Sequence, residues 1–429
     1  MRIRFSLLLL LSACTAAVTP PPAQERPDVL EEIRRDPDKA GTLMYLYDYA
    51  SEVPLTPAPK GYKPFYISHI GRHGARFALA AQYDTVYRVL CAAEAAECLT
   101  GRGARLCAEY RDFYDSVKLR EGDLSPRGVE EQRMLAARLY RRFPEVFRGQ
   151  TRGTAISTTV PRVILSMTSF VDALQERDRT LELSCDASAA YSPVLCPPFS
   201  AAYGDQAVAP TVASAPFEPY FRETVDIDGI LGRIFSAPET VVARLQFDEV
   251  QFLRFLFSLS NGMKCLDPAP SPLFEGLFTP EDALAVSRAE WYRIFRFLGR
   301  YEGSPGNFWE LAVHTLDDIV AKADEDIASG TVQLRLRFSH DSFVMPLVVR
   351  MNLNGYGAVA HSPEEAYEIY PCWEMPMGGS IQLIFYRSRR SEDILVKVLL
   401  NEREATLPFE AAEGPYYRWS DFLREYTIK

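Results

Sequence analysis

The spacing of hydrophobic residues alternates along the chain between the period of a strand and the period of a helix. Short apolar or alternating runs predict β-strands at 64–70, 153–158, 333–338, 381–386 and 394–400. Apolar residues at helical spacing predict helices near 126–143, 163–174, 247–260, 280–300 and 307–328. The strands lie toward the two ends of the chain, and the region between them is mainly helical. This order predicts an α/β core with a mixed sheet, helices on both faces and a helical insert.

The change in pattern also suggests where the domains begin and end. Residues 25–184 and 331–429 would form the α/β core, and 185–330 would form a mainly helical insert, or cap, domain. Proline clusters at 193–198 and 268–272 lie within the insert and support this change of character, and 429 residues are enough for one or two domains.

Residues 1–24 resemble a targeting segment and a tether. Arg2 and Arg4 precede a short apolar run, which is too short to cross a bilayer. The run leads into Leu11-Ser12-Ala13-Cys14, which resembles the lipobox of bacterial lipoproteins, with Cys14 as the lipidated residue; ordinary signal cleavage near 13–17 is the alternative. We therefore expect an exported protein, anchored by lipid in the bacterial cell envelope, on its periplasmic or outer side. The anchor would be its only contact with a membrane.

Composition narrows the choice of partner. The net charge of −10 weighs against nucleic acid, because proteins that bind nucleic acid usually carry a basic face. A phosphate site in such a protein must be a local basic pocket. Export permits disulfides, and Cys185–Cys196 or Cys91 with Cys98 or Cys107 would be local bridges. The oligomeric state cannot be read from these features.

The run Arg72-His73-Gly74-Ala75-Arg76 directly follows the first predicted strand. Guanidinium groups bind phosphate oxygens through bidentate, charge-assisted hydrogen bonds. Glycine lets the backbone come close to an anion. A neutral imidazole between the two arginines could attack phosphorus. The run is therefore a candidate phosphate site, although a surface turn with an exposed histidine would have the same residues.

Two further segments follow predicted strands in the same way. His340-Asp341 comes after 333–338, and Arg162 comes shortly after 153–158. If these strands are neighbours, all three segments meet at the carboxyl edge of the sheet, where ligands bind in open α/β folds. Together they supply a nucleophile, cations for phosphate oxygens and an acid for the leaving group. Taken singly, Asp341 could be a helix N-cap and Arg162 a solvated helix residue.

These segments, in this order, resemble the histidine phosphatase superfamily. Within it, they are similar to the branch of histidine acid phosphatases, phytases and multiple inositol polyphosphate phosphatases. The resemblance runs from about residue 60 to the end and is diffuse in the insert. It rests on four segments: Arg72 to Arg76, Leu124 to Phe143, Ser157 to Phe170 with Arg162 and Ser166, and Phe338 to Asp341.

The resemblance implies a role for each candidate residue. His73 would be the nucleophile that forms a phosphohistidine, and Asp341 would protonate the leaving oxygen. Four residues would bind the phosphate: Arg72, Arg76, Arg162 and His340. The implied mechanism needs no cofactor and no metal, and the substrate would be a small phosphomonoester. Inositol phosphates, including phytate, are one substrate class, and sugar phosphates or other small phosphomonoesters are the alternative.

The motifs depart from the family pattern at two points. Phe77 stands where many phytases have proline, which is closer to the inositol polyphosphate phosphatases. Those enzymes typically carry His-Ala-Glu at the second motif, whereas this chain has His340-Asp341, as in phytases and acid phosphatases. The cations of the insert could decide the substrate if they face the pocket: Arg222, Arg233, Arg244, Arg254, Lys264, Arg293 and Arg296.

Two other classes of function fit part of the pattern. A phosphate-ligand-binding lipoprotein without catalysis could use the same fold, although both the nucleophile and the acid are present. A metal-dependent hydrolase could use His69, His73 and a carboxylate, because the two histidines lie four residues apart. A zinc site needs three or four ligands, and a histidine in a strand is more often a core residue, so we expect His69 to be structural.

Overall fold

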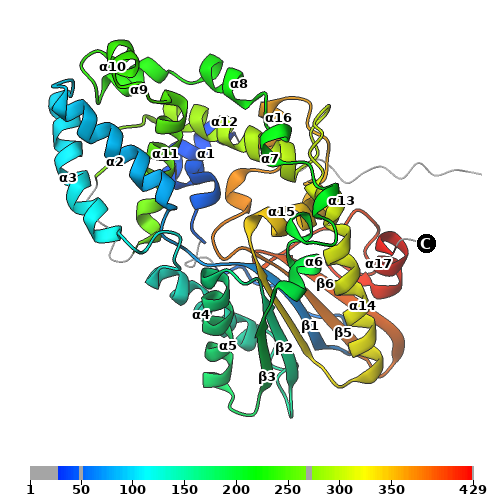
Figure 1. Cartoon of the computed structure of the whole chain (residues 1–429). Helices are drawn as coiled ribbons and strands as arrows, with labels where there is room; N and C mark the ends of the chain where they lie inside the picture. Colours follow the sequence, from blue (N-terminus) through cyan, green and yellow to red (C-terminus); the bar gives the residue numbers. More distant parts are fainter. Residues whose placement is uncertain (1–27, 48–51, 267–272, 428–429) are drawn as a thin grey trace, which may run out of the picture.

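The computed structural model describes residues 28–47, 52–266 and 273–427, and Cys14 lies outside these ranges. Its centre is an eight-stranded mixed sheet with the order β3-β2-β4-β1-β5-β6-β7, in which β8 also pairs with β6. The strands are β1 (Tyr62–Arg72), β2 (Arg152–Ser157), β3 (Glu182–Ala187), β4 (Leu334–Ser339), β5 (Ser380–Ser388), β6 (Ser391–Leu400), β7 (Arg403–Glu404) and β8 (Tyr417–Arg418). Figure 1 shows the sheet in the lower half of the molecule and a group of helices above it. The mixed α/β fold expected from the sequence is therefore confirmed.

Strand β1 lies in the middle of the sheet and joins its parallel and antiparallel parts. It pairs with β4 in parallel, with Arg72 opposite Ser339, and with β5 in antiparallel orientation. On the other side of β4, β2 and β3 continue the parallel part. The carboxyl ends of β1, β2 and β4 consequently meet at one edge of the sheet.

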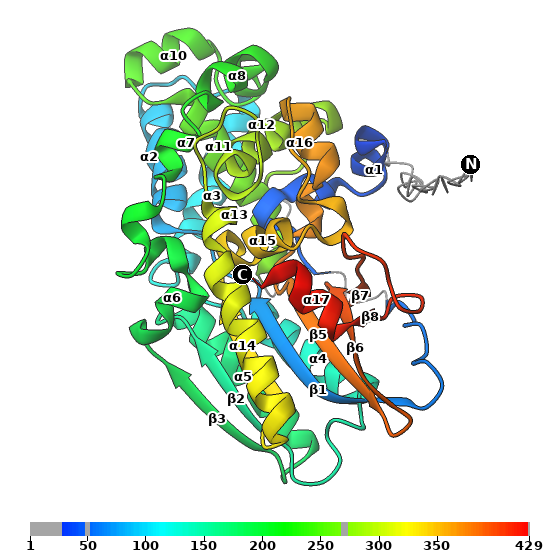
Figure 2. The same cartoon turned by 90° about the vertical axis from the view of Figure 1, so that its right-hand side faces the viewer.

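Helices cover both faces of the sheet. On one face lie α4 (Pro126–Arg142) and α5 (Pro161–Arg177), whose buried residues Leu135, Leu139, Val163 and Phe170 share a core cluster with Leu336 of β4. On the other face lie α14 (Val313–Ser329), α15 (Asp341–Arg350) and α17 (Trp419–Tyr426). Figure 2 shows α14 running across that face, in front of the strands. The expectation of helices on both faces holds.

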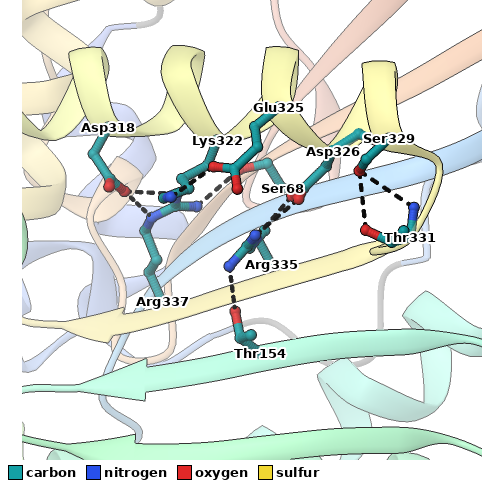
Figure 3. A network of polar contacts seen from close by, with 10 residues as sticks. All are labelled: Ser68, Thr154, Asp318, Lys322, Glu325, Asp326, Ser329, Thr331, Arg335 and Arg337. Carbon is teal, nitrogen blue, oxygen red and sulfur yellow. Dashed lines mark hydrogen bonds and ion pairs between the residues drawn. The ribbon is translucent and has the colours of Figure 1, made fainter.

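Strand β4 explains how α14 is held on the sheet. Its alternating sequence places leucines and a phenylalanine on one face and Arg335 and Arg337 on the other. Arg335 forms a bidentate ion pair with Asp326 of α14, at 2.7 and 2.8 Å. Two nitrogens of Arg337 bind Asp318, which lies about two turns before Asp326 on the same helix, at 2.9 and 2.7 Å (Figure 3). The polar face of the strand is thus buried under a helix rather than open to water.

The helices above the sheet come from several parts of the chain. Helices α2 (Ala80–Ala95) and α3 (Gly101–Val117) pack together, and α2 contacts α11 (Glu249–Gly262), which belongs to the predicted insert. The other helices are α1 (Val29–Arg35), α6 (Ser192–Leu195), α7 (Pro210–Ala213), α8 (Phe217–Thr224), α9 (Ile227–Gly232), α10 (Pro238–Leu245), α12 (Pro280–Leu298), α13 (Phe308–Leu311) and α16 (Pro363–Ile369). From 188 to 330, the regular elements of the described residues are all helices. The proposed domain boundaries stay a prediction.

The cysteines and the lengths of the helices complete the description of the fold. In the described ranges the seven cysteines are free, so neither local bridge, Cys185–Cys196 or Cys91 with Cys98 or Cys107, is formed. The thiol of Cys98 instead donates a hydrogen bond to the carbonyl of Ala96. No helix within the described residues has the length and hydropathy needed to span a bilayer.

Candidate active site

The ends of three parallel strands bring the candidate residues together. Strand β1 ends at Arg72 and β4 ends at Ser339, and these two residues are paired across the strands. The backbone N–H of His73 then donates to the carbonyl of Ser339, at 3.1 Å, so the two motifs run side by side. Strand β2 ends at Ser157, four residues before α5 begins, and Arg162 lies in the first turn of that helix. The neighbouring strands assumed in the sequence analysis are therefore present.

Close backbone packing fixes the loop after β1. A Cβ atom on Gly74 would lie 2.4 Å from the carbonyl oxygen of Gly128, and one on Gly128 would lie 2.2 Å from that of Ala75. Only glycine fits at either position. The side chain of Ser125 caps α4 by accepting from the N–H of Gly128, and the carboxylate of Glu131 accepts from the N–H of Ala75 at 2.5 Å. The loop is therefore held against the start of α4.

His73 is buried and has a defined proton position. Its Nδ1 lies 2.9 Å from the carbonyl oxygen of Gly74. Because a carbonyl can only accept, Nδ1 must carry the proton, and in the neutral ring Nε2 then holds the lone pair. Burial and the positive charge of the neighbouring Arg72 lower the pKa of His73 well below its usual range. The imidazole is therefore neutral at neutral pH, as a nucleophile needs to be.

Arg72 and Asp341 form an ion pair in the centre of the site. The Nη2 atom of Arg72 lies 2.7 Å from Oδ2 of Asp341, and Arg72 is fully buried. Two backbone carbonyls, of Leu43 and Met375, also accept from its guanidinium, at 2.7 and 2.9 Å. Burial raises the pKa of Asp341, but the opposing effect of the nearby Arg72 and other cationic groups is larger, so its pKa lies well below the usual range. The carboxyl is ionised in this state.

Three arginines of the candidate site have a buried hydrogen-bond donor without an acceptor. The Nε atoms of Arg72, Arg76 and Arg162 are buried and have no hydrogen-bond partner among the described residues. Burial and the neighbouring arginines lower the pKa of Arg76 to about 10, and burial also lowers the pKa of Arg162. Buried donors are normally satisfied in proteins, so unsatisfied ones require an explanation. An anion with several oxygens would both satisfy these donors and relieve the repulsion among the cations.

His340 faces His73 across the site. Its ring centroid lies 5.5 Å from that of His73, at an angle of 74°. Nε2 of His340 lies 3.3 Å from the hydroxyl of Thr158, a residue of the loop between β2 and α5. Burial and the positive charge of Arg162 lower the pKa of His340 to about 4. A neutral imidazole at this place can donate one hydrogen bond to a bound oxygen.

Ser166 connects two of these segments and was named in the sequence analysis only as part of its motif. Its hydroxyl accepts from the N–H of Gly74 at 3.1 Å and donates to the carbonyl of Arg162 at 2.8 Å. Ser166 is fully buried. One side chain therefore links the loop that carries His73 to the helix turn that carries Arg162. Sequence reasoning also missed Thr158 and Glu131 as partners of the site.

The other histidines lie elsewhere. His69 is buried, and its ring packs against Phe170 and Phe338 with centroid distances of 5.2 and 5.6 Å. A Cβ atom on Gly71 would lie 2.7 Å from Nε2 of His69, so the imidazole of His69 lies directly against the backbone of Gly71. Among the described residues, no three His, Cys, Asp or Glu side chains gather in a way suited to a metal ion. His314 stacks on Tyr203, and the exposed His361 pairs with Glu302.

The chain belongs to the histidine phosphatase superfamily, branch 2. The family pattern matches residues 67–196 and 269–401, which include all six candidate site residues: the five of the two motifs, and Arg162. This membership supports phosphatase activity as the general function. No curated protein sequence matches the chain.

Solved structures share the fold at low sequence identity. A multiple inositol polyphosphate phosphatase of Bifidobacterium longum, in complex with inositol hexasulfate, is 18% identical with a TM-score of 0.73, covering 90% of this chain and 97% of its own. The phytase from D. castellii is 15% identical with a TM-score of 0.68, covering 91% and 84%. Hafnia alvei phytase in complex with myo-inositol hexakis sulphate is 12% identical with a TM-score of 0.54, covering 86% and 98%.

Proposed function

We propose that the protein is a phosphomonoesterase that transfers the phosphoryl group of its substrate to Nε2 of His73 and then to water. The observation that carries this proposal is the neutral imidazole of His73 beside three buried guanidinium Nε donors that lack acceptors. The guanidinium groups of Arg72, Arg76 and Arg162 would hold the phosphate oxygens, and His340 would donate a further hydrogen bond. Positively charged donors aimed at the transferring group stabilise the charge that spreads over its oxygens.

Asp341 is the proposed proton donor, and its pairing with Arg72 suggests how it gains a proton. A phosphate dianion would compete for Arg72 and add negative charge beside the carboxyl. Both effects raise the pKa of Asp341 from its low value in the free protein. A protonated Asp341 could then protonate the leaving oxygen, and the resulting carboxylate could take a proton from the attacking water. Substrate binding would thus prepare the acid.

Inositol phosphates, including phytate, are the first proposed substrate class. The reason is the fold likeness over nine-tenths of the chain to a multiple inositol polyphosphate phosphatase, together with Phe77 after the first motif. A sequence identity of 18% supports a shared fold and nothing finer. The proposed substrate class therefore also depends on the phosphate-binding residues of the candidate site.

The cations of the helical region favour a second candidate, a phosphatase for small phosphomonoesters such as sugar phosphates. Of the seven insert cations that could line the pocket, five pair with carboxylates and two donate to backbone carbonyls. The paired ones are Arg222, Arg233, Arg254, Lys264 and Arg293, and the other two are Arg244 and Arg296. A polyphosphate would gain from free cations at the pocket mouth, and this region offers it few.

A substrate panel separates these candidates. Phosphate release would be measured from phytate, a sugar phosphate, a nucleotide and an aryl phosphate, each with and without EDTA. We expect hydrolysis that EDTA does not affect. A kcat/KM at least tenfold higher for phytate would support the inositol phosphate class, and comparable values would support the small-substrate class. No hydrolysis of any compound would argue for the non-catalytic binding protein, and EDTA-sensitive hydrolysis for a metal-dependent enzyme.

We also propose that the protein is exported and anchored through Cys14, on the basis of its N-terminal sequence. Metabolic labelling with a fatty-acid analogue tests this. The wild type should be labelled, and Cys14→Ser should not.

A further inference from the structure

A depression of about 870 Å3 lies at the end of the sheet opposite the candidate active site. Its lining residues come from 60–65 at the start of β1, from 145–151 between α4 and β2, from Gln333 before β4, and from 387–390 around the β5–β6 turn. This turn lies at the bottom of Figure 2. Strand β1 begins in the depression and ends at Arg72. At about 3.3 Å per residue, Lys63 and Arg72 are about 30 Å apart along the strand, so the two places are separate.

The depression concentrates positive charge in an acidic protein. Six exposed cations line it: Lys60, Lys63, Arg148, Arg387, Arg389 and Arg390. Among its described lining residues Glu145 is the only carboxylate. None of the six cations forms an ion pair within the part of the chain that the structure describes. This contrasts with the helical region, where most of the arginines considered above have a carboxylate partner.

The strand register brings two of these cations face to face. Lys63 of β1 lies directly opposite Arg387 of β5, on the same face of the sheet. Like charges at such positions destabilise a sheet. Arg387 lies over the ring of Phe65, with 4.6 Å from its guanidinium carbon to the ring centroid. This contact orients the guanidinium but does not neutralise it. Arg389 and Arg390 extend the same charge around the turn.

We propose that this depression is a second, non-catalytic site that binds several phosphate groups at once. Clustered guanidinium and ammonium groups bind phosphate through bidentate and point-charge contacts, and a cluster without carboxylates has no internal competitor. The net charge of −10 would repel a polyanion elsewhere on the surface, so binding would concentrate here. The phosphates could belong to a free polyphosphorylated small molecule or to the headgroups of an anionic lipid surface. In the second case the active site would face away from the lipid.

The test compares two charge reversals of equal size. Arg389→Glu/Arg390→Glu changes the turn in the depression, and Arg88→Glu/Arg105→Glu changes two exposed arginines on α2 and α3. In one arm, inositol hexakisphosphate is titrated by calorimetry into each protein in a His73→Ala background, which prevents turnover, and binding at the candidate active site is fitted as a separate class that neither charge reversal should change. In the other arm, each protein is floated with phosphatidylcholine vesicles that contain or lack phosphatidylglycerol. Salt is kept low, because exposed charges are screened at higher ionic strength.

We expect the reversal in the depression to weaken binding at least tenfold in one arm, while the reversal on α2 and α3 stays within twofold of the parent. Loss in the calorimetric arm identifies a free polyphosphate as the ligand, and loss in the vesicle arm identifies a lipid surface. Equal binding by parent and Arg389→Glu/Arg390→Glu in both arms would overturn the proposal. Hydrolysis of an aryl phosphate, with His73 intact, should be unchanged in both double variants. If the parent itself does not hydrolyse the aryl phosphate, that result contradicts the proposed function and leaves the test of the second site unchanged.

Discussion

The carboxylate of Asp341 lies 2.7 Å from the guanidinium of Arg72, the residue directly before His73. The pair joins the ends of β1 and β4, and it gives each group a second role. Arg72 keeps the carboxyl ionised in the free protein, and Asp341 offsets part of the positive charge around His73. In the proposed mechanism a bound phosphate has to compete for Arg72, so substrate binding and protonation of Asp341 would be coupled.

Asp341→Asn should slow substrates with poor leaving groups most. An alkyl phosphate needs protonation of its leaving oxygen, whereas an aryl phosphate departs more easily. We expect kcat to fall by about 100-fold or more for the alkyl ester and by much less for the aryl ester. Steady-state kinetics with both esters measures the difference. Equal losses on the two substrates would contradict the proposed acid role.

Ser166→Ala should impair catalysis more than it impairs folding. The change removes the hydroxyl that links Gly74 to Arg162, and it should cost about 1 kcal/mol of unfolding free energy. Loss of alignment between His73 and Arg162 should lower kcat/KM by about tenfold or more. Ser169→Ala is the matched control, because Ser169 donates to the carbonyl of Leu165 on the same helix and is also buried. Similar kinetic losses in both variants would refute a positioning role for Ser166.

Gly128→Ala should separate α4 from the loop that carries His73. The added Cβ would lie 2.2 Å from the carbonyl oxygen of Ala75, and neither backbone can move without the other. We expect a loss of about 1–3 kcal/mol in unfolding free energy, with a parallel loss of activity. Urea denaturation and kinetics measure both. Gly101→Ala, at the exposed start of α3 with no atom within 4 Å of the new Cβ, should keep both properties. A fully active Gly128→Ala would show that the close packing is not required.

His69→Leu should make stability less dependent on pH. Burial lowers the pKa of His69 to about 3, below its value of 6.5 in the unfolded chain. Between these values the unfolded state binds more protons, so stability falls as pH drops from 6.5 toward 3. At pH 4.5 this histidine alone accounts for a loss of about 3 kcal/mol relative to pH 7. Leucine does not titrate.

The measurement is the difference in unfolding free energy between pH 7 and pH 4.5, which should be smaller for His69→Leu than for the wild type. Activity should remain, because His69 packs against Phe170 and Phe338 rather than binding a ligand. Abolished activity in a folded variant would instead favour the metal-dependent hydrolase.

The sequence predicted the strands of the sheet core and the two segments that meet in the candidate site, because both are local signals. Short apolar or alternating runs identified β1, β2, β4, β5 and β6, and apolar residues at helical spacing predicted α4, which begins at Pro126. The arrangement of His73 next to His340-Asp341 followed from placing both at strand ends. The short strand β3 and helices α2 and α3 were not predicted, because their apolar positions were not read as periodic.

Other features depend on contacts between distant segments. The alternation in β4 did not reveal that Arg335 and Arg337 lie under α14 (Figure 3), since buried and solvated polar faces have the same pattern. The carbonyl partners of Arg72 come from loops that no motif marks. Glu131 did leave a signal, because it occupies the buried face of α4 together with Leu135. A carboxylate at such a position requires a polar partner, here the N–H of Ala75.

Detection of a covalent phosphohistidine at His73 is the most direct test of the proposed mechanism. Wild-type protein would be mixed with a radiolabelled phosphomonoester, quenched within milliseconds in alkali, digested and analysed by mass spectrometry. We expect an alkali-stable, acid-labile phosphate on the peptide that contains His73, and no label in His73→Ala. Turnover without any labelled peptide, or label on another residue, would contradict it.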